Sequence, residues 1–251
     1  MIGIVGGVGP YAGLDLQRKI LRETVSQSDQ AFLAVTSISD PAPIPDRTAY
    51  LLGETTINPA GPIGAQLRQL EAIGATVAGI PCNTAHAPQI MGLILEGLAA
   101  RGSRLRLLHL VQEVGQFLLD HYPAVRSVGL LSTMGTALSC IYPLTLRPMG
   151  FEVLTPERSL IATCLQPAIY DPQYGIKANG CVTPPAMNQL RIGIDYLQAQ
   201  GAEALILGCT ELPLAFAGLT FEGLPLIDST LVLARALIRA EDPRKLRPFS
   251  P

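Results

Sequence analysis

Short runs of apolar residues alternate along the chain with longer segments whose apolar positions recur every three or four residues. The short runs are typical of buried strands and the longer segments of amphipathic helices. We expect strands at residues 2–5, 32–38, 105–108, 128–131, 151–154, 204–207 and 224–227, and one more leading into Cys82. We expect helices at residues 11–28, 135–148, 157–169, 185–200 and 230–238, one beginning near Pro88, and one ending near His121. This alternation indicates parallel sheets in an α/β architecture.

The order of elements repeats in the two halves of the chain. Cys82 and Cys209 lie 127 positions apart, and residues 3–9 match residues 129–135 at an offset of 126. Such a register is typical of an internal duplication. We therefore predict an α/β fold of two pseudo-symmetric lobes, each a parallel sheet flanked by helices, with the active site in the cleft between them.

Each half delivers a cysteine from the end of an apolar run. Residues 77–84 read VAGIPCNT and residues 205–211 read LILGCTE, so Cys82 and Cys209 each follow a buried strand. Open α/β sheets place their chemistry at the carboxyl ends of strands. Two thiols in equivalent places predict a site with two sides.

Composition narrows the classes of partner. The 251 residues are 48% hydrophobic, and 18 basic residues stand against 20 acidic ones without a basic run. We therefore expect small molecules or other proteins as partners, with no nucleic-acid partner and no membrane partner. The amino terminus lacks a basic region, so we expect no signal peptide and a cytoplasmic location.

The remaining cysteines and the histidines offer little chemistry. Five cysteines form an odd set without a CxxC pair, which argues against a disulfide framework and a zinc ribbon. The three histidines are scattered, so we expect no metal. The cysteines outside the two motifs are expected to be buried structural residues: Cys140, Cys164 and Cys181.

A glycine-rich run opens the chain. Residues 7–13 read GVGPYAG, and this GxGxxxG spacing with an interrupting proline is a weak match to a dinucleotide fingerprint. A glycine turn that contacts the substrate through Gly7 and Gly9 fits the run better.

Three segments carry a resemblance to a known family. Residues 6–10 (GGVGP), 81–86 (PCNTAH) and 208–214 (GCTELPL) are similar to motifs of the cofactor-independent Asp/Glu racemases, which include hydantoin racemases and maleate isomerases. Glutamate racemases carry Asp-Ser in the first motif and GCTHYPL in the last. Glycines and Glu-Leu stand there instead, which resembles the aspartate racemase branch. The resemblance covers essentially the whole chain and implies an isomerase that racemises aspartate without a cofactor.

Racemisation removes a proton from one face of the α-carbon and supplies one to the opposite face. Two thiols that flank the carbon can do this when one is a thiolate and the other is protonated. Cys82 and Cys209 are therefore the candidate catalytic pair.

Polar residues next to the cysteine strands are candidates to hold the α-carboxylate as it gains negative charge. Asn83, Thr84 and Thr210 directly follow the cysteines. The candidates after the strand at residues 128–131 are Ser132, Thr133, Gly135 and Thr136. Helix capping alone is the alternative role for these residues, because Ser, Thr and Asn favour caps.

Arg47 and Lys177 are candidates to bind the side-chain carboxylate of aspartate. They lie 130 positions apart in expected loops, so each lobe brings one cation to the cleft. In aspartate racemases an Arg and a Lys in similar contexts contact this carboxylate. Solvated surface cations are the plain alternative.

The resemblance also implies an exchange of chain ends between the lobes. The first lobe is expected to comprise residues 1–104 plus 211–251, and the second residues 105–210. The strand at residues 224–227 and the helix after it then return to the first lobe, while the strand at residues 105–108 begins the second. Relatives are commonly homodimers, so we expect a homodimer.

Other functions are compatible with the same residues. A glutamate or other acidic amino-acid racemase, a maleate isomerase-like enzyme and a non-catalytic protein that binds acidic amino acids stay open. An arylmalonate decarboxylase is disfavoured because both thiols are present. A pyridoxal phosphate racemase is disfavoured because Lys177 alone among three lysines is expected near the site.

Overall fold

Two parallel sheets organise the chain in this computed structural model, which describes residues 1–250. The first sheet has the order β2-β1-β3-β4, and its strands are β1 (Ile2–Val5), β2 (Val35–Ile38), β3 (Val77–Gly79) and β4 (Arg106–Leu107). The second has the order β6-β5-β7-β9-β8, and its strands are β5 (Ser127–Leu131), β6 (Glu152–Leu154), β7 (Ala204–Leu207), β8 (Thr220–Phe221) and β9 (Leu224–Asp228). All pairings are parallel except β8 with β9, so the predicted α/β fold of two parallel-sheet lobes is confirmed.

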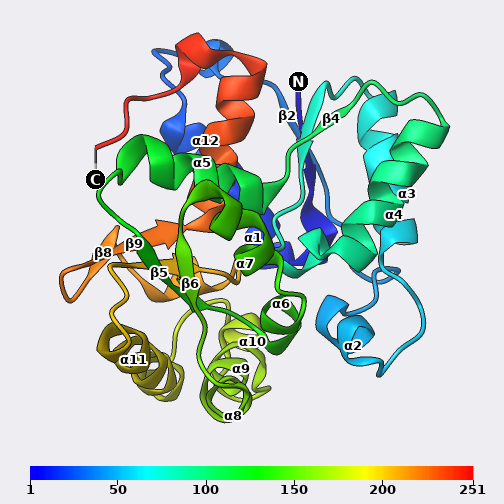
Figure 1. The fold of residues 1–251 in the computed structure, drawn as a ribbon. Helices are drawn as coiled ribbons and strands as arrows, with labels where there is room; N and C mark the ends of the chain where they lie inside the picture. The colour runs from blue at the N-terminus through cyan, green and yellow to red at the C-terminus, as the bar shows by residue number, and fades with distance from the viewer. Residues whose placement is uncertain (251) are drawn as a thin grey trace.

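Helices cover both faces of each sheet (Figure 1). Helices α3 (Ala60–Ala72) and α4 (Pro88–Ala100) pack on one face of the first sheet, and α1 (Pro10–Glu23) and α12 (Ser229–Glu241) pack on the other. One face of the second sheet carries α5 (Leu110–His121) and α7 (Ile141–Leu146). Its other face carries α8 (Arg158–Leu160), a π-helical turn (Ile161–Leu165), α9 (Gln166–Tyr170), α10 (Ile176–Asn179) and α11 (Pro184–Ala199).

The central strands are apolar along their whole length because both of their faces are covered. All four residues of β1 (IGIV) and all four of β7 (ALIL) are buried. Strands of parallel sheets read as continuous apolar runs for this reason. Proline at the first turn of α1, α4 and α11 has no amide hydrogen to leave unpaired, which fixes where these helices begin.

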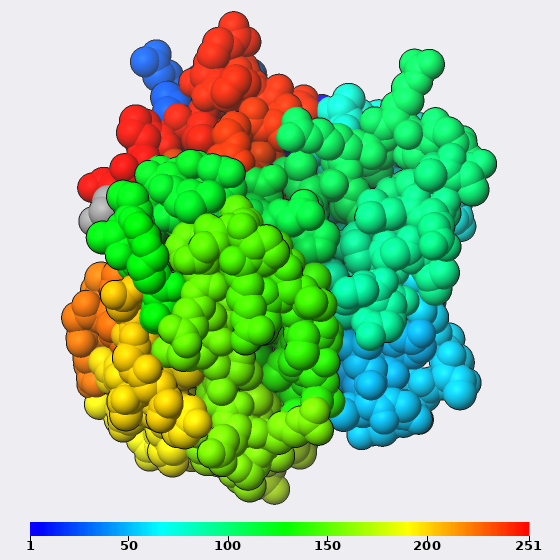
Figure 2. All heavy atoms as spheres, in the orientation of Figure 1, coloured from blue at the N-terminus to red at the C-terminus, as the bar shows by residue number. Residues whose placement is uncertain are grey.

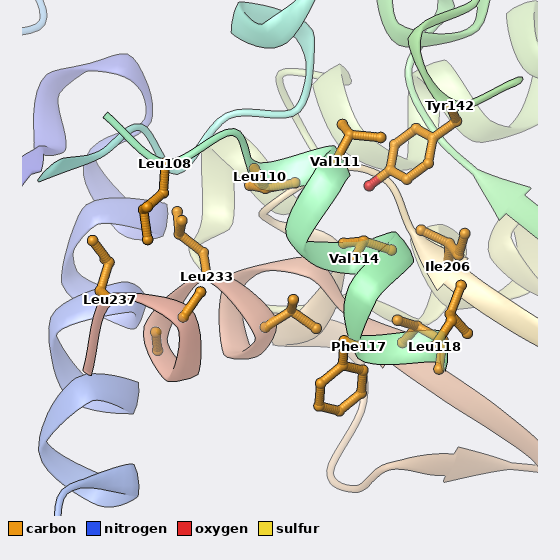
Figure 3. Close-up of a cluster of buried hydrophobic side chains, with 14 of the residues drawn as sticks. Leu108, Leu110, Val111, Val114, Phe117, Leu118, Tyr142, Ile206, Leu233 and Leu237 are labelled. Carbon is orange, nitrogen blue, oxygen red and sulfur yellow. The ribbon is translucent and has the colours of Figure 1, made fainter. Parts of the chain in front are cut away.

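One hydrophobic core runs through both lobes. Side chains of α1, α5 and α12 meet between the sheets. In Figure 3, Leu108 lies near Leu233 and Leu237 of α12, and Val114 of α5 lies farther along the same cluster. The same cluster includes Ile206 of β7. The short helices α2 (Arg47–Leu52) and α6 (Met134–Leu138) form a second contact between the lobes (Figure 1), and the segment around residue 50 abuts the second lobe on the surface in Figure 2.

The expected exchange of chain ends was wrong for the two strands. Strand β4 pairs with β3 in the first sheet, because the chain leaves α4 and returns along the free edge of β3. Strand β9 pairs with β7 in the second sheet, where β7 has a free edge opposite β5. The last helix, α12, packs against α1 and β3 of the first lobe and also against α5 of the second.

Several boundaries also differ from the expected ones. The helix expected at residues 135–148 is broken into α6 and α7, because Cys140 adopts a left-handed conformation with φ of 52°. The first helix ends at Glu23 rather than at residue 28, and the second strand begins at Val35. Within residues 1–250, no helix combines the length and apolarity needed to span a membrane.

Candidate active site

The two cysteine strands end at one small cavity between the lobes. The first lobe contributes to its lining four of the predicted site residues: Arg47, Cys82, Asn83 and Thr84. The second lobe contributes four more: Thr133, Lys177, Cys209 and Thr210. The cavity offers about 10 Å³ in which the centre of a water molecule can lie. It can therefore hold about one water molecule.

Both thiols are buried, and neither forms a disulfide. Cys82 follows β3 and is 9% exposed, and Cys209 follows β7 and is 6% exposed. Each lies beyond the carboxyl end of an inner strand of its sheet, as the sequence register predicts.

Hydrogen bonds between the lobes hold the two cysteine segments together. The Thr210 hydroxyl donates to the Pro81 carbonyl at 3.0 Å. The hydroxyls of Thr84 and Thr136 are 2.8 Å apart and share a hydrogen bond. Because each bond joins one lobe to the other, the thiols are held in a fixed relation.

The side-chain amide of Asn83, which lines the cavity, makes two hydrogen bonds. It donates to the Ser229 hydroxyl at 3.2 Å and accepts from the Tyr142 hydroxyl at 2.6 Å. Burial, followed by the charge of a Cys209 thiolate, raises the pKa of Tyr142, so this phenol remains a neutral donor. These contacts position the segment that carries Cys82.

Arg47 is the first residue of α2 rather than a loop residue, and it is only 8% exposed. Its Nη2 donates to the Val8 carbonyl at 2.6 Å, while its buried Nε has no partner among the described residues. Burial opposes its charge, but the groups of Cys82, Asp46 and Tyr170 outweigh burial and raise the pKa of Arg47. The site therefore contains a permanently charged guanidinium whose Nε–H is available to donate a hydrogen bond.

Lys177 lies in α10, also not in a loop, and it forms an ion pair with Glu211. The other carboxylate oxygen of Glu211 accepts from the Cys209 thiol at 3.0 Å. Burial and then the Glu211 charge raise the pKa of Cys209 well above its ordinary value. Burial works to raise the pKa of Glu211 as well, but Lys177 lowers it, so Glu211 is a carboxylate.

Glu211 and Tyr170 are lining residues that sequence reasoning missed. Glu211 stands within the GCTELPL motif, so its proximity to Cys209 was available from the sequence. Tyr170 comes from α9, and no motif marks it. The Lys177 ammonium lies 5.3 Å from the centre of the Tyr170 ring, an arrangement that stabilises the cation.

Five predicted residues lie outside the inner cavity. Gly7 and Gly9 line an outer hollow of about 300 Å³ instead, which shares Val8, Arg47, Lys177 and Glu211 with the inner cavity. Three others pack behind the lining residues: Ser132, Gly135 and Thr136. A side chain at Gly135 would approach Thr48 to 2.7 Å, so this glycine allows α6 to contact α2.

His86 supports the Cys82 segment from below. Its Nδ1 donates to the Cys82 carbonyl at 2.9 Å, and its ring meets that of His109 edge to face. Burial, and secondarily the nearby His109, lowers the pKa of His86 to about 3. His86 is therefore a neutral structural residue.

The expectation for the other three cysteines was wrong. Cys140 and Cys181 are exposed and Cys164 is half-buried, because they lie in loops or on outer helix faces rather than behind a strand. Within residues 1–250, no three His, Cys, Asp or Glu side chains are grouped as metal ligands would be.

A cavity between two parallel-sheet lobes, with one thiol from each, is the arrangement that the duplicated sequence predicts. The sequence profile of the Asp/Glu/hydantoin racemase family matches residues 5–237. The chain belongs to this family. It is an isomerase, an amino-acid racemase that acts on a small amino-acid substrate.

Solved structures agree with this assignment. The aspartate racemase of Picrophilus torridus is 27% identical, with a TM-score of 0.77 over 95% of this chain and 93% of that one. An aspartate racemase homologue from Pyrococcus horikoshii is 24% identical, with a TM-score of 0.69 over 95% of this chain and 97% of that one. A glutamate racemase of Francisella tularensis, in complex with D-glutamate, is 17% identical, with a TM-score of 0.69 over 100% of this chain and 84% of that one. The last two structures are less than 25% identical to this chain, so their similarity supports the shared fold alone.

Proposed function

We propose that the protein interconverts L- and D-aspartate by proton transfer between the α-carbon and two thiols, without a cofactor. The observation that carries the proposal is one cavity lined by Cys82, Cys209, Arg47 and Lys177. The two thiols come from equivalent strands of opposite lobes, as a reaction on two faces of one carbon requires. The 27% identity with the Picrophilus torridus aspartate racemase supports aspartate as the substrate.

The proton transfers balance without any change of oxidation state. In one direction the Cys82 thiolate takes the α-proton, and the electrons of the C–H bond remain on the substrate as an enediolate. The Cys209 thiol then protonates the opposite face and becomes a thiolate. The reverse reaction exchanges the two roles, so each turnover leaves the pair in the opposite protonation state.

The α-carboxylate needs hydrogen-bond donors because it gains charge when the proton leaves. The hydroxyls of Thr84 and Thr133 line the cavity and lie 3.5 Å apart. We assign them this role, with the backbone donors that follow Cys82 and Cys209. Asn83 has a positioning role, because its side-chain amide hydrogen-bonds to Ser229 and Tyr142.

The side-chain carboxylate is assigned to the two cations. The unpartnered Nε of Arg47 is a donor for which a carboxylate is the natural acceptor. Lys177 supplies a second positive charge from the other lobe.

Exchange of the α-proton with solvent tests the reaction. We expect wild-type protein in D₂O to replace the α-proton of L-aspartate with deuterium while the optical rotation decays to zero, as followed by NMR and polarimetry. The control is the Cys82→Ala/Cys209→Ala double variant, with folding checked by circular dichroism. Absence of both exchange and racemisation in the wild type would overturn the proposal.

Three substrates test the assignment of the cations. Arg47→Ala and Lys177→Ala should each lower kcat/KM for aspartate about 10- to 100-fold, the value of a charge-assisted hydrogen bond. Any residual turnover of alanine, which lacks the second carboxylate, should change little. Equal losses with aspartate, glutamate and alanine would show that these cations do not read the side chain.

A homodimer in the cytoplasm stays a prediction from the family resemblance and the composition. Sedimentation of the purified protein measures the oligomeric state.

A further inference from the structure

Glu211 neither takes nor supplies a proton in the transfers proposed above, yet it lies at the centre of the site. It is 3% exposed, and its carboxylate lies between the Lys177 ammonium and the Cys209 thiol. A buried carboxylate next to a thiol that must become a thiolate disfavours that charge. Holding Cys209 protonated serves only one direction of the reaction, so the presence of Glu211 calls for a further explanation.

Glu211 and Lys177 form the boundary between two spaces. Both residues line the inner cavity that contains the thiols and the outer hollow that contains Gly7 and Gly9. The inner cavity has room for about one water, whereas the outer hollow offers about 300 Å³. Aspartate is several times larger than a water, so some lining group must move before substrate reaches the thiols.

The Glu211 side chain is the lining group best suited to move. Arg47 is fixed by its hydrogen bond to Val8, and Thr210 is fixed by its bond to Pro81. The Glu211 carboxylate is also held, by Lys177 and by the Cys209 thiol, but it sits at the end of a flexible arm against the bare backbone of Gly9, where an added Cβ would lie 2.9 Å from Oε1. Its rotation away from Lys177 would join the inner cavity to the outer hollow.

We propose that Glu211 is a built-in competitor for the substrate: in the free enzyme its carboxylate occupies Lys177 and closes the cavity, and the substrate's side-chain carboxylate displaces it. The inference rests on the proposed function for the identity of the incoming group. A carboxylate in the substrate replaces the partner that Lys177 loses. A neutral amino acid would separate the ion pair and leave Lys177 uncompensated, so Glu211 increases selectivity for acidic substrates at a cost in affinity.

Replacement of Glu211 by glutamine tests the competition directly. Glutamine has the same shape and can still accept a hydrogen bond from Cys209, but it cannot form an ion pair with Lys177. If Glu211 occupies Lys177 for about nine-tenths of the time, Glu211→Gln tightens binding of a dicarboxylate about tenfold. The probe is succinate, which has no amino group and is not racemised, and its Kd is measured by calorimetry.

Kinetics separate competition from a structural role. Competition predicts that Glu211→Gln lowers KM for L-aspartate in parallel with the Kd of succinate, and that it narrows the preference for aspartate over alanine. A merely structural role lowers kcat and leaves KM unchanged or raised. Glu222→Gln is the matched control, because it removes the same charge from an exposed ion pair with Arg191.

A second variant guards against a folding defect. Glu211→Asp keeps the negative charge near Lys177 but shortens the arm by one methylene, so it should tighten succinate binding about threefold. Unchanged, weaker or undetectable succinate binding in both variants would overturn the inference. Exchange of the α-proton of aspartate by the wild type is a separate measurement, so failure of the proposed function and failure of the competition are distinguishable.

Discussion

The two cysteine segments occupy equivalent places in the fold but have opposite electrostatic surroundings. Cys82 lies beside the guanidinium of Arg47, a permanent cation. Cys209 donates to the carboxylate of Glu211, which favours the protonated thiol. In the register of the repeat, Glu211 corresponds to Thr84, so the difference arises largely at one position.

This comparison separates what the duplication provides from what individual side chains provide. The repeated strands bring one thiol from each side to the same cavity. A two-base racemase also needs the thiols to differ in protonation at any moment, because two thiols or two thiolates could not complete the reaction. The unlike neighbours supply that difference within a nearly symmetric frame.

The largest effect is expected from removing one thiol. Cys82→Ser and Cys209→Ser should each lower racemisation about 10³-fold, because a hydroxyl is a poor base for the α-proton. Each variant should still exchange the α-proton of one enantiomer in D₂O, with opposite preference in the two variants. NMR on L- and D-aspartate measures the exchange, and Cys140→Ser, which changes an exposed cysteine, is the control. Near-normal racemisation by either site variant would contradict the two-thiol mechanism.

A second difference between the segments concerns stability towards acid. His86 corresponds in register to Pro213, so only the first segment contains a buried imidazole. The pKa of His86 is about 3 in the folded protein, whereas an unfolded histidine titrates near 6.5. The unfolded state therefore binds a proton first as pH falls below about 6.5, and stability is lost from there down to the folded pKa.

We expect this single group to remove about 3 kcal/mol of the free energy of unfolding between pH 7 and pH 4.5. His86→Asn should show a correspondingly shallower loss in urea titrations across that range. His121→Asn, which changes a more exposed histidine, is the control; burial lowers the pKa of His121 as well, so this variant should change the profile in the same direction but by less. Parallel pH profiles for wild type and His86→Asn would contradict the assignment.

The smallest effect is the difference in thiol reactivity at neutral pH. Cys82 should react with iodoacetamide about tenfold faster than Cys209, because burial and Glu211 raise the pKa of Cys209. Glu211→Gln should bring the ratio of the Cys82 alkylation rate to the Cys209 alkylation rate closer to one. Mass spectrometry of the two peptides from one sample gives both rates, and the thiols are similarly buried, at 9% and 6% exposure. Alkylation of Cys209 at least as fast as Cys82 would exclude the electrostatic asymmetry.

The sequence predicted the elements that depend on local pattern and repetition. Cys82 and Cys209 could be placed at strand ends because the apolar runs before them and the constant offset between the two repeats can be read from the sequence. Arg47 and Lys177 were expected near the cleft, but their positions on short helices depend on contacts with Val8, Glu211 and Tyr170 that no local pattern encodes.

Other features depended on tertiary competition. Strand β4 has only two residues, so its choice of sheet follows from the free edge of β3 rather than from its own sequence. The break at Cys140 interrupts an otherwise helical pattern through a left-handed residue that is neither Gly nor Asn. The ion pair of Glu211 joins residues 34 positions apart. Pattern analysis detects none of these.

The crossing of α12 makes the first lobe discontinuous in the chain, because its last helix follows the whole of the second sheet. Strand β9 completes the second sheet, and the helix that follows it directly covers the first. A hinge between the lobes would have to stretch this connection and open the core that α1, α5 and α12 share. The lobes should consequently move and unfold together. Substrate should then enter through movement of side chains at the rim of the cavity rather than through a hinge motion of one lobe.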